Sequence, residues 1–131
     1  MSERKVILII EDQSDIRKLI RMTLELGDSE IHEAENGESG WHMFKALRPD
    51  LVLLDVMMPG SLDGYQVCQK IRQEPGLCNI PVILLTARGQ QADFEMGRQA
   101  GADAYLTKPF SPLELIDTVD SQLARTVGAH A

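Results

Sequence analysis

The stretch of sequence that decides the fold is residues 51–59, which read Leu-Val-Leu-Leu-Asp-Val-Met-Met-Pro. Its four consecutive apolar residues, preceded by Pro49-Asp50, predict a short strand that is buried on both faces of a sheet. Asp55 closes this apolar run. A single Asp in such a position often does no more than begin the next turn, so the ends of the other apolar runs decide whether Asp55 belongs to a site.

Three further apolar runs also end in polar residues. These are Glu11 and Asp12 after residues 6–10, Thr86 after residues 81–85, and Lys108 after residues 104–107. Segments with helical periodicity separate the runs, and this alternation predicts one parallel sheet with helices on both faces. The carboxyl ends of parallel strands meet at one edge of the sheet, where ligands bind. We therefore expect these side chains to converge with Asp55 on one site.

The helical segments differ in how clearly the sequence marks them. The first is predicted from residue 14 onward by four aliphatic residues on one face, Ile16, Leu19, Ile20 and Leu24. Trp41 falls in the apolar stripe of the second helix and is expected to be packed core. Residues 111–114 read Ser-Pro-Leu-Glu, a capping box with proline at the first helical position, and predict a well-formed fifth helix. Residues 30–34 are short and polar enough for an edge strand.

The fourth helix, expected over residues 90–100, has the weakest signal. It contains Gly97, and Met96 is the only large apolar residue expected on its inner face. Phe94 lies nearly opposite Met96 around the helix and is expected to face solvent. A helix packed this loosely is a candidate for movement relative to the sheet.

Length and composition restrict the class of protein. A chain of 131 residues with 44% hydrophobic residues fits one domain, predicted over residues 1–125 with a disordered tail at 126–131. No apolar run is long enough to span a bilayer. The net charge of −7 disfavours nucleic-acid binding by this chain. Cys68 and Cys78 form no disulfide framework or metal spacing, which favours the reducing cytoplasm.

The residue types at the expected site suggest phosphoryl chemistry. Glu11, Asp12 and Asp55 would repel one another if they lie close together, and carboxylate oxygens suit Mg²⁺ or Ca²⁺. A site with few protein ligands and a phosphate suits Mg²⁺. A carboxylate can attack phosphorus to form an aspartyl phosphate, and the transfer then needs neutralised charge and correct positioning. Lys108 and Thr86 can bind the phosphoryl oxygens.

At this point the sequence resembles the receiver domains of two-component response regulators, similar to the chemotaxis regulator, over about residues 5–125. Besides the residues at the strand ends, the resemblance rests on Met58-Pro59, Asp63-Gly64, Thr86-Ala87, Gly101-Ala102-Asp103 and Lys108-Pro109-Phe110. It implies a flavodoxin-like fold, a five-stranded parallel sheet of order 2-1-3-4-5. It also implies a cis peptide bond between Lys108 and Pro109.

The resemblance implies a role for each site residue. Asp55 would accept a phosphoryl group from a histidine kinase or a histidine phosphotransfer protein. Mg²⁺ would be held by Asp12, Asp55 and the backbone carbonyl of Met57, with Glu11 assisting through water. Thr86 and Lys108 would bind the phosphoryl oxygens, so the chain would act catalytically only in its own phosphorylation and dephosphorylation.

The expected output is a change of surface shape. Tyr105 matches the family's switch aromatic, which turns inward when Thr86 moves toward the phosphate. The face made by the fourth helix, the fifth strand and the fifth helix, with Phe94 and Tyr105 at its border, would then control a downstream protein partner or a homodimer. The sequence leaves open whether the receiver stands alone or belongs to a longer regulator or hybrid kinase.

Two departures and two rival interpretations remain. The loop after Pro59 is one residue longer than is usual in the family, through Gly60-Ser61-Leu62, and Met57 and Arg88 occupy variable positions that tune loss of the phosphoryl group.

A flavodoxin-like flavin binder would need small or hydroxyl residues where Glu11-Asp12 stands. An aspartyl phosphohydrolase commonly has a second Asp where Met57 stands. Both rivals fit the residues poorly.

Overall fold

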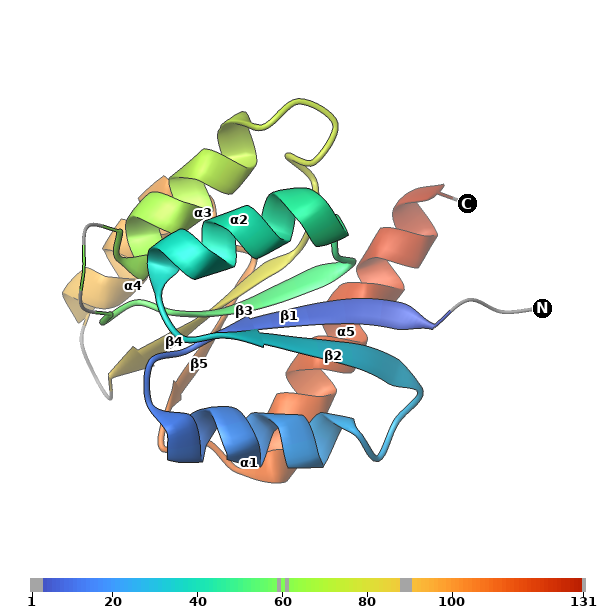
Figure 1. Ribbon diagram of the computed structural model, residues 1–131. Helices are drawn as coiled ribbons and strands as arrows, with labels where there is room; N and C mark the ends of the chain where they lie inside the picture. The colour runs from blue at the N-terminus through green and yellow to red at the C-terminus, as the bar shows by residue number, and fades with distance from the viewer. Residues whose placement is uncertain (1–3, 59, 61, 88–90, 131) are drawn as a thin grey trace.

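The computed structural model describes the chain apart from residues 1–3, 59, 61, 88–90 and 131, and apart from the side chains of residues 87, 91–94 and 125–130. Strands and helices alternate along it, as the sequence predicts (Figure 1). The strands are β1 (Lys5–Ile10), β2 (Ser29–Ala34), β3 (Leu51–Asp55), β4 (Val82–Ala87) and β5 (Ala104–Lys108). The helices are α1 (Ser14–Leu24), α2 (Gly37–Leu47), α3 (Gly64–Gln73), α4 (Gln91–Ala100) and α5 (Pro112–His130).

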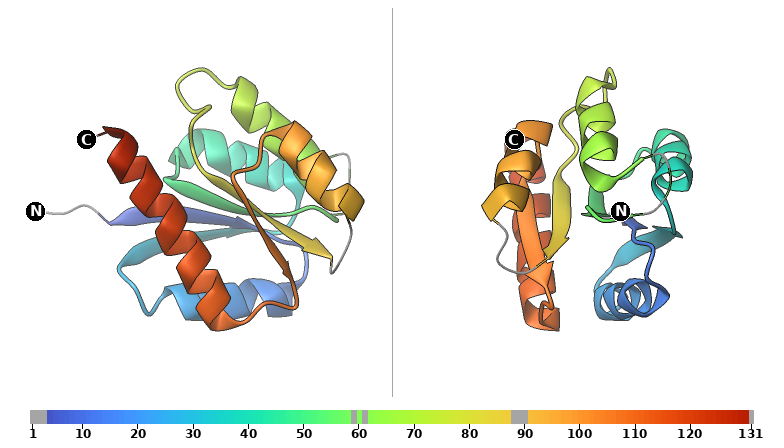
Figure 2. Two further views of the ribbon diagram at one scale, coloured as in Figure 1. Left: turned by 180° about the vertical axis from the view of Figure 1, so that it is seen from behind. Right: turned by 90° about the vertical axis from the view of Figure 1, so that its left-hand side faces the viewer.

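All the strands are parallel and lie in the order β2-β1-β3-β4-β5, which confirms the predicted flavodoxin-like topology. The sheet separates two apolar cores (Figure 2). One core contains Ile20 of α1 and Leu115 of α5, and the other contains Phe44 of α2, Cys68 of α3 and Ala100 of α4. The four apolar residues at 51–54 are fully buried because they pack on both cores, as a doubly covered strand requires.

The strand order positions the site. β1 lies between β2 and β3, and Ile10 of β1 is in register with Leu54 of β3. The residues that follow these two strands therefore emerge side by side, at the point where the order of strands reverses. Asp55 is in turn in register with Leu85, the residue before Thr86.

Two side-chain predictions for the helices are wrong. Leu19 is 42% exposed because the buried stripe of α1 runs through Ile20, Thr23 and Leu24, and Leu19 lies at its edge. In α4, Met96 is 48% exposed, and the buried positions are Gly97 and Ala100. Over residues 95–100, the part of α4 whose side chains are described, the inner face thus consists of small residues, and Gly97 lies close to Tyr105 and Leu84 beneath it. The side chain of Phe94 is outside the described part of the chain.

The predicted edge strand and the predicted start of the fifth helix are both confirmed, whereas the helix continues beyond its predicted end. β2 lies at the edge of the sheet, as expected, and begins one residue before the predicted stretch. At the start of α5, the Glu114 backbone N–H donates to Ser111 Oγ (3.1 Å) and the Ser111 backbone N–H donates to Glu114 Oε1 (3.2 Å), which confirms the capping box. α5 then continues to His130, through residues for which the sequence predicts a disordered tail. The domain boundary at residue 125 stays a prediction. None of the helices, over the residues described, is long and apolar enough to cross a membrane.

Candidate functional site

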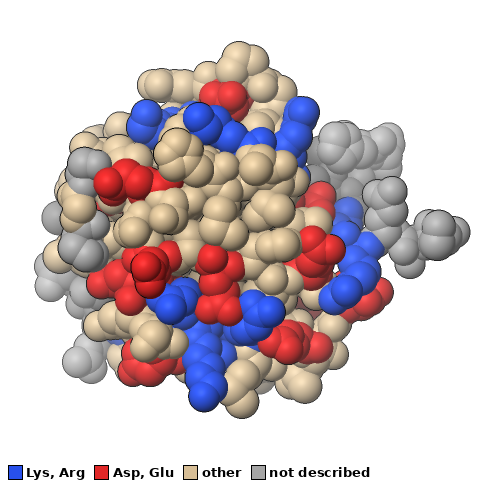
Figure 3. Space-filling view, in the orientation of Figure 1, with Lys and Arg blue, Asp and Glu red and all other residues tan. Residues whose placement is uncertain are grey.

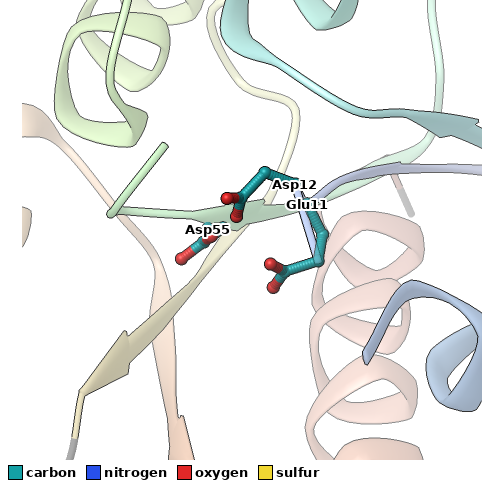
Figure 4. Close-up of side chains that lie close together, drawn as sticks. All are labelled: Glu11, Asp12 and Asp55. Atoms are coloured by element: carbon teal, nitrogen blue, oxygen red, sulfur yellow. The ribbon is translucent and has the colours of Figure 1, made fainter. Parts of the chain in front are cut away.

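Three carboxylates gather at the carboxyl ends of β1 and β3. Carboxylate oxygens of Glu11, Asp12 and Asp55 all lie within 4.8 Å of one another, and Figure 4 shows the three groups pointing toward a common space. Glu11 is fully buried and Asp55 is 2% exposed, whereas Asp12 is half-buried at the rim. The convergence expected from the strand ends is therefore present, and it places strong negative charge where little water can screen it.

Lys108, at the end of β5, supplies the opposing charge. Its Nζ lies 2.9 Å from Glu11 Oε1 and 3.2 Å from Asp55 Oδ1. The peptide bond from Lys108 to Pro109 is cis, as the resemblance implied. Two backbone groups add hydrogen bonds: the Met57 N–H donates to Asp55 Oδ1 (3.1 Å), and the Gln13 N–H donates to Glu11 Oε2 (3.1 Å). One cation thus links two buried carboxylates from different strands.

The electrostatics show where a proton is held when no cation neutralises the cluster. Burial, followed by the nearness of Asp12 and Glu11, raises the pKa of Asp55 from 3.8 to about 8. Burial acts in the same direction on Asp12, but contacts with Asp55 and Glu11 and the charge of Lys108 outweigh it and lower the pKa of Asp12. Burial also acts to lower the pKa of Lys108, yet Glu11 and Asp55 raise it. Lys108 therefore keeps its charge, and Asp55 holds a proton more strongly than Asp12 does.

The donor set fits a hard divalent cation. Carboxylate oxygens are the ligands that Mg²⁺ prefers, and a site with few protein ligands leaves room for water and phosphate. Asp55 Oδ2 and Thr86 Oγ1 are buried and accept or donate no hydrogen bond within the described residues. Buried polar atoms without a partner are costly. Asp55 Oδ2 is thus ready to bind a cation, and Thr86 Oγ1 can still form a hydrogen bond.

Glu35 and Glu38 were not anticipated as neighbours of the site. They line, with Asp12, Asn36 and Gly60, a hollow of about 430 Å³ at its rim. Glu35 directly follows β2, so the rule of strand ends could have found it. Gly60 belongs to the lengthened loop and has φ of +104°, which glycine adopts without strain. Two other residues of that loop, Pro59 and Ser61, lie outside the described residues.

The remaining predicted site residues lie around this cluster. Met57 is 71% exposed beside Asp55, so its side chain covers little of the site. Thr86 is fully buried in β4. Tyr105 is half-buried and lies against α4 at Gly97, where an added methyl group would be 2.6 Å from Tyr105 Cε1. Arg88 lies outside the described residues.

Comparison with known families agrees with this geometry. The profile of the response regulator receiver domain matches residues 7–120 of the chain. The chain belongs to the response regulator receiver domains. This family acts in two-component signalling, and its doubly wound sheet, with acidic residues after the first and third strands, is what the structure contains.

Individual relatives of this receiver domain are similar over nearly its whole length. It is 44% identical over 119 residues to the transcriptional regulatory protein ResD of Bacillus subtilis, covering 91% of this chain and 48% of ResD. It is 39% identical over 122 residues to the phosphate regulon transcriptional regulatory protein PhoB of Pseudomonas aeruginosa, covering 93% of this chain and 53% of PhoB. The chain thus spans about half the length of the curated relatives it matches.

A solved structure supports the same assignment. The receiver domain of Francisella response regulator 1452 superposes with a TM-score of 0.85 at 31% identity, covering 94% of this chain and 99% of that domain. The similarity in fold therefore extends over nearly the whole chain.

Proposed function

We propose that Asp55 of this receiver accepts a phosphoryl group from the histidine of a kinase or of a phosphotransfer protein. The observation that carries the proposal is the position of Lys108, whose Nζ contacts both Glu11 and Asp55 at the buried end of the sheet. An ammonium held there can neutralise a phosphoryl oxygen on Asp55, because phosphoryl transfer depends mainly on charge neutralisation and positioning. The receiver would then be a switch whose state is set by phosphorylation.

Each residue has a distinct part in the proposed transfer. A carboxylate oxygen of Asp55 attacks phosphorus, the O–P bond forms, and the P–N bond to the donor imidazole breaks. Lys108 stabilises the charge on one phosphoryl oxygen, and the free hydroxyl of Thr86 donates to another. Asp12, Asp55 and the Met57 carbonyl would hold Mg²⁺, with Glu11 assisting through water. When bound, the metal neutralises charge on the phosphoryl group.

The proposal is tested by labelling with a small acyl-phosphate donor. Wild-type protein in Mg²⁺ should acquire hydroxylamine-labile phosphate, and Asp55→Asn should acquire none because an amide is not a competent nucleophile. Removal of divalent cations with a chelator should also suppress the labelling. Asp117→Asn is the matched control, since Asp117 is an exposed residue of α5 far along the chain from the cluster, and it should label like wild type. Equal labelling of the Asp55→Asn variant would refute the assignment.

The wider setting is part of the same proposal. The chain would take part catalytically only in its own phosphorylation and dephosphorylation. Cys68 is buried and Cys78 exposed, and both are free thiols, which fits the cytoplasm where such donors act. ResD and PhoB are described as transcriptional regulatory proteins. The proposed output of this receiver is a contact with a protein partner or a second copy, and the net charge of −7 opposes binding of nucleic acid by these 131 residues themselves.

The face formed by α4, β5 and α5 is the proposed output surface. The contact between Tyr105 of β5 and Gly97 of α4 supports this choice, because a movement of the Tyr105 ring would displace α4. Among residues 95–100 of α4 only Gly97 and Ala100 are buried, so no large apolar side chain anchors this part of the helix. Phe94 and Tyr105 would border the surface.

A nuclear magnetic resonance experiment tests the output surface. Beryllofluoride, which mimics the phosphoryl group, should perturb amide signals of residues 86–108 more than those of residues 14–26. Phe94→Ala should weaken binding to a partner or to a second copy and leave labelling of Asp55 intact. Perturbations confined to the loops around Asp12 and Asp55 would exclude this output surface and leave the phosphorylation site untouched.

A further inference from the structure

A patch of positive charge lies over α2 and α3, on a chain whose net charge is −7. Its members are Lys45 of α2, Arg48 directly after α2, and Lys70 of α3, all exposed. Figure 3 shows a row of Lys and Arg side chains across the upper part of the molecule, over α2 and α3, with some acidic atoms beside them, whereas most acidic side chains lie lower on this face. The surface over α2 and α3 is therefore locally positive, although the chain as a whole is negative.

Two of these cations converge on one aromatic ring. Lys45 Nζ lies 5.2 Å and Lys70 Nζ 5.4 Å from the centroid of Trp41, so the two ammonium groups are at most about 11 Å apart, which is close to one Debye length at moderate salt. The ring stacks on Phe44 with centroids 5.7 Å apart and planes 13° apart. Because Phe44 is fully buried, the indole is a fixed platform.

The cations of this patch lack carboxylate partners. Among the described residues, Lys45, Arg48 and Lys70 form no salt bridge, whereas the neighbouring Arg72 is paired with Asp103. Attraction between an ammonium group and the indole ring can explain the position of one lysine. The negative end of the helix dipole can explain why each helix, taken alone, carries a lysine in its last turn. Neither effect explains why two like charges meet at one ring, since no carboxylate in the described part of the chain forms an ion pair with either lysine.

We propose that Trp41, Lys45, Arg48 and Lys70 form a docking surface for an acidic peptide segment of a partner protein. Glutamate or aspartate carboxylates would lie between the two ammonium groups and the Arg48 guanidinium, with the peptide's aliphatic carbons against the exposed part of the indole. Duplex nucleic acid fits less well, because the patch offers few cations and the rest of the chain repels a polyanion. This surface is separate from Asp55 and goes beyond the proposed phosphoryl transfer.

The test uses the full chain and a fluorescein-labelled glutamate peptide of about ten residues, at about 20 mM salt where surface charge is little screened. Anisotropy should report saturable binding, and emission of Trp41, the one tryptophan in the chain, should change with the same midpoint. Lys45→Gln combined with Lys70→Gln should weaken binding about tenfold. Lys5→Gln combined with Lys18→Gln removes the same charge elsewhere and should leave affinity within about twofold.

Other outcomes would overturn the proposal. These are equal weakening by both double variants, absence of binding at low salt, tighter binding of a single-stranded oligonucleotide of similar charge, and self-association that the lysine variants abolish. The last two would assign the patch to nucleic acid or to a second copy of the chain. Asp55→Asn should bind the peptide like wild type, so failure of the docking surface and failure of the phosphorylation site give different results.

Discussion

Gly64→Ala is expected to destabilise this receiver by about 3 kcal/mol or more and to disturb the phosphorylation site. Gly64 is the first residue of α3, and its N–H donates to the Val56 carbonyl (3.3 Å). A methyl group at this position would lie 2.2 Å from the Asp55 carbonyl oxygen and 2.7 Å from Val56 Cα. Both are backbone atoms, so the clash can be relieved only by moving α3 or the end of β3.

Urea unfolding followed by Trp41 fluorescence measures the change in the free energy of unfolding. Gly27→Ala is the matched control, because the nearest atom to its added methyl group would be the Leu24 carbonyl oxygen at an ordinary 3.6 Å, and its stability should stay within about 1 kcal/mol of wild type. Labelling of Asp55 should fall in Gly64→Ala and remain in Gly27→Ala. Equal stability of the two variants would contradict the close packing of α3 on the phosphoacceptor strand.

The sheet and the membership of the acidic cluster were predictable from sequence because both depend on strands buried on two faces. Such strands consist almost entirely of apolar residues, so a polar residue at the end of one is conspicuous. Asp55 and Thr86 were found in this way, and the parallel order then requires them to meet at one edge. Glu35 was missed because β2 is an edge strand with polar residues of its own, so its end does not stand out.

Side-chain burial on the helices was less predictable. An apolar stripe gives the buried face of a helix only to within about one residue, because a helix advances about 100° per residue. Leu19 therefore fell at the edge of the face rather than inside it. In α4 the prediction failed for another reason: a close approach selects small residues, so Gly97 and Ala100 occupy the inner face while the larger Met96 points outward.

Contacts between elements distant in sequence were predictable only where strand ends meet. The strand-end pattern predicted that Lys108 would converge with Asp55, but its closer contact with Glu11 was not foreseen. Trp41 is partly buried and stacked on Phe44, as its apolar stripe suggests. The approach of Lys70 from α3 depends on the angle at which two helices pack, which no local pattern encodes.

Lys108→Met is expected to lower the free energy of unfolding by about 2 kcal/mol at pH 8 without divalent cations, since removing one partner of a buried ion pair leaves the other uncompensated. Glu11 is fully buried and Asp55 nearly so, whereas the Lys108 side chain is 22% exposed, which places the effect below that of a completely buried pair. Circular dichroism during urea unfolding gives the free energy. A loss below about 0.5 kcal/mol would mean that the ammonium contributes no more than a surface charge.

The pH dependence of the same variants distinguishes charge from packing. The pKa of Asp55 is raised to about 8, so between about pH 4 and pH 8 the folded protein holds a proton that the unfolded chain has released. Stability from this group is therefore present at low pH and declines as pH rises toward 8. Asn at position 55 cannot ionise, so Asp55→Asn should flatten that decline. In the double variant it should also reduce the loss in the free energy of unfolding that Lys108→Met causes.

Millimolar Mg²⁺ should restore part of the stability of Lys108→Met, because a cation bound by Asp12 and Asp55 offsets the charge that the lysine no longer neutralises. An identical loss at pH 5 and pH 8, unchanged by Asp55→Asn or Mg²⁺, would show that Lys108 stabilises the fold through its contact with Glu11 or through packing, and not through the charge of Asp55.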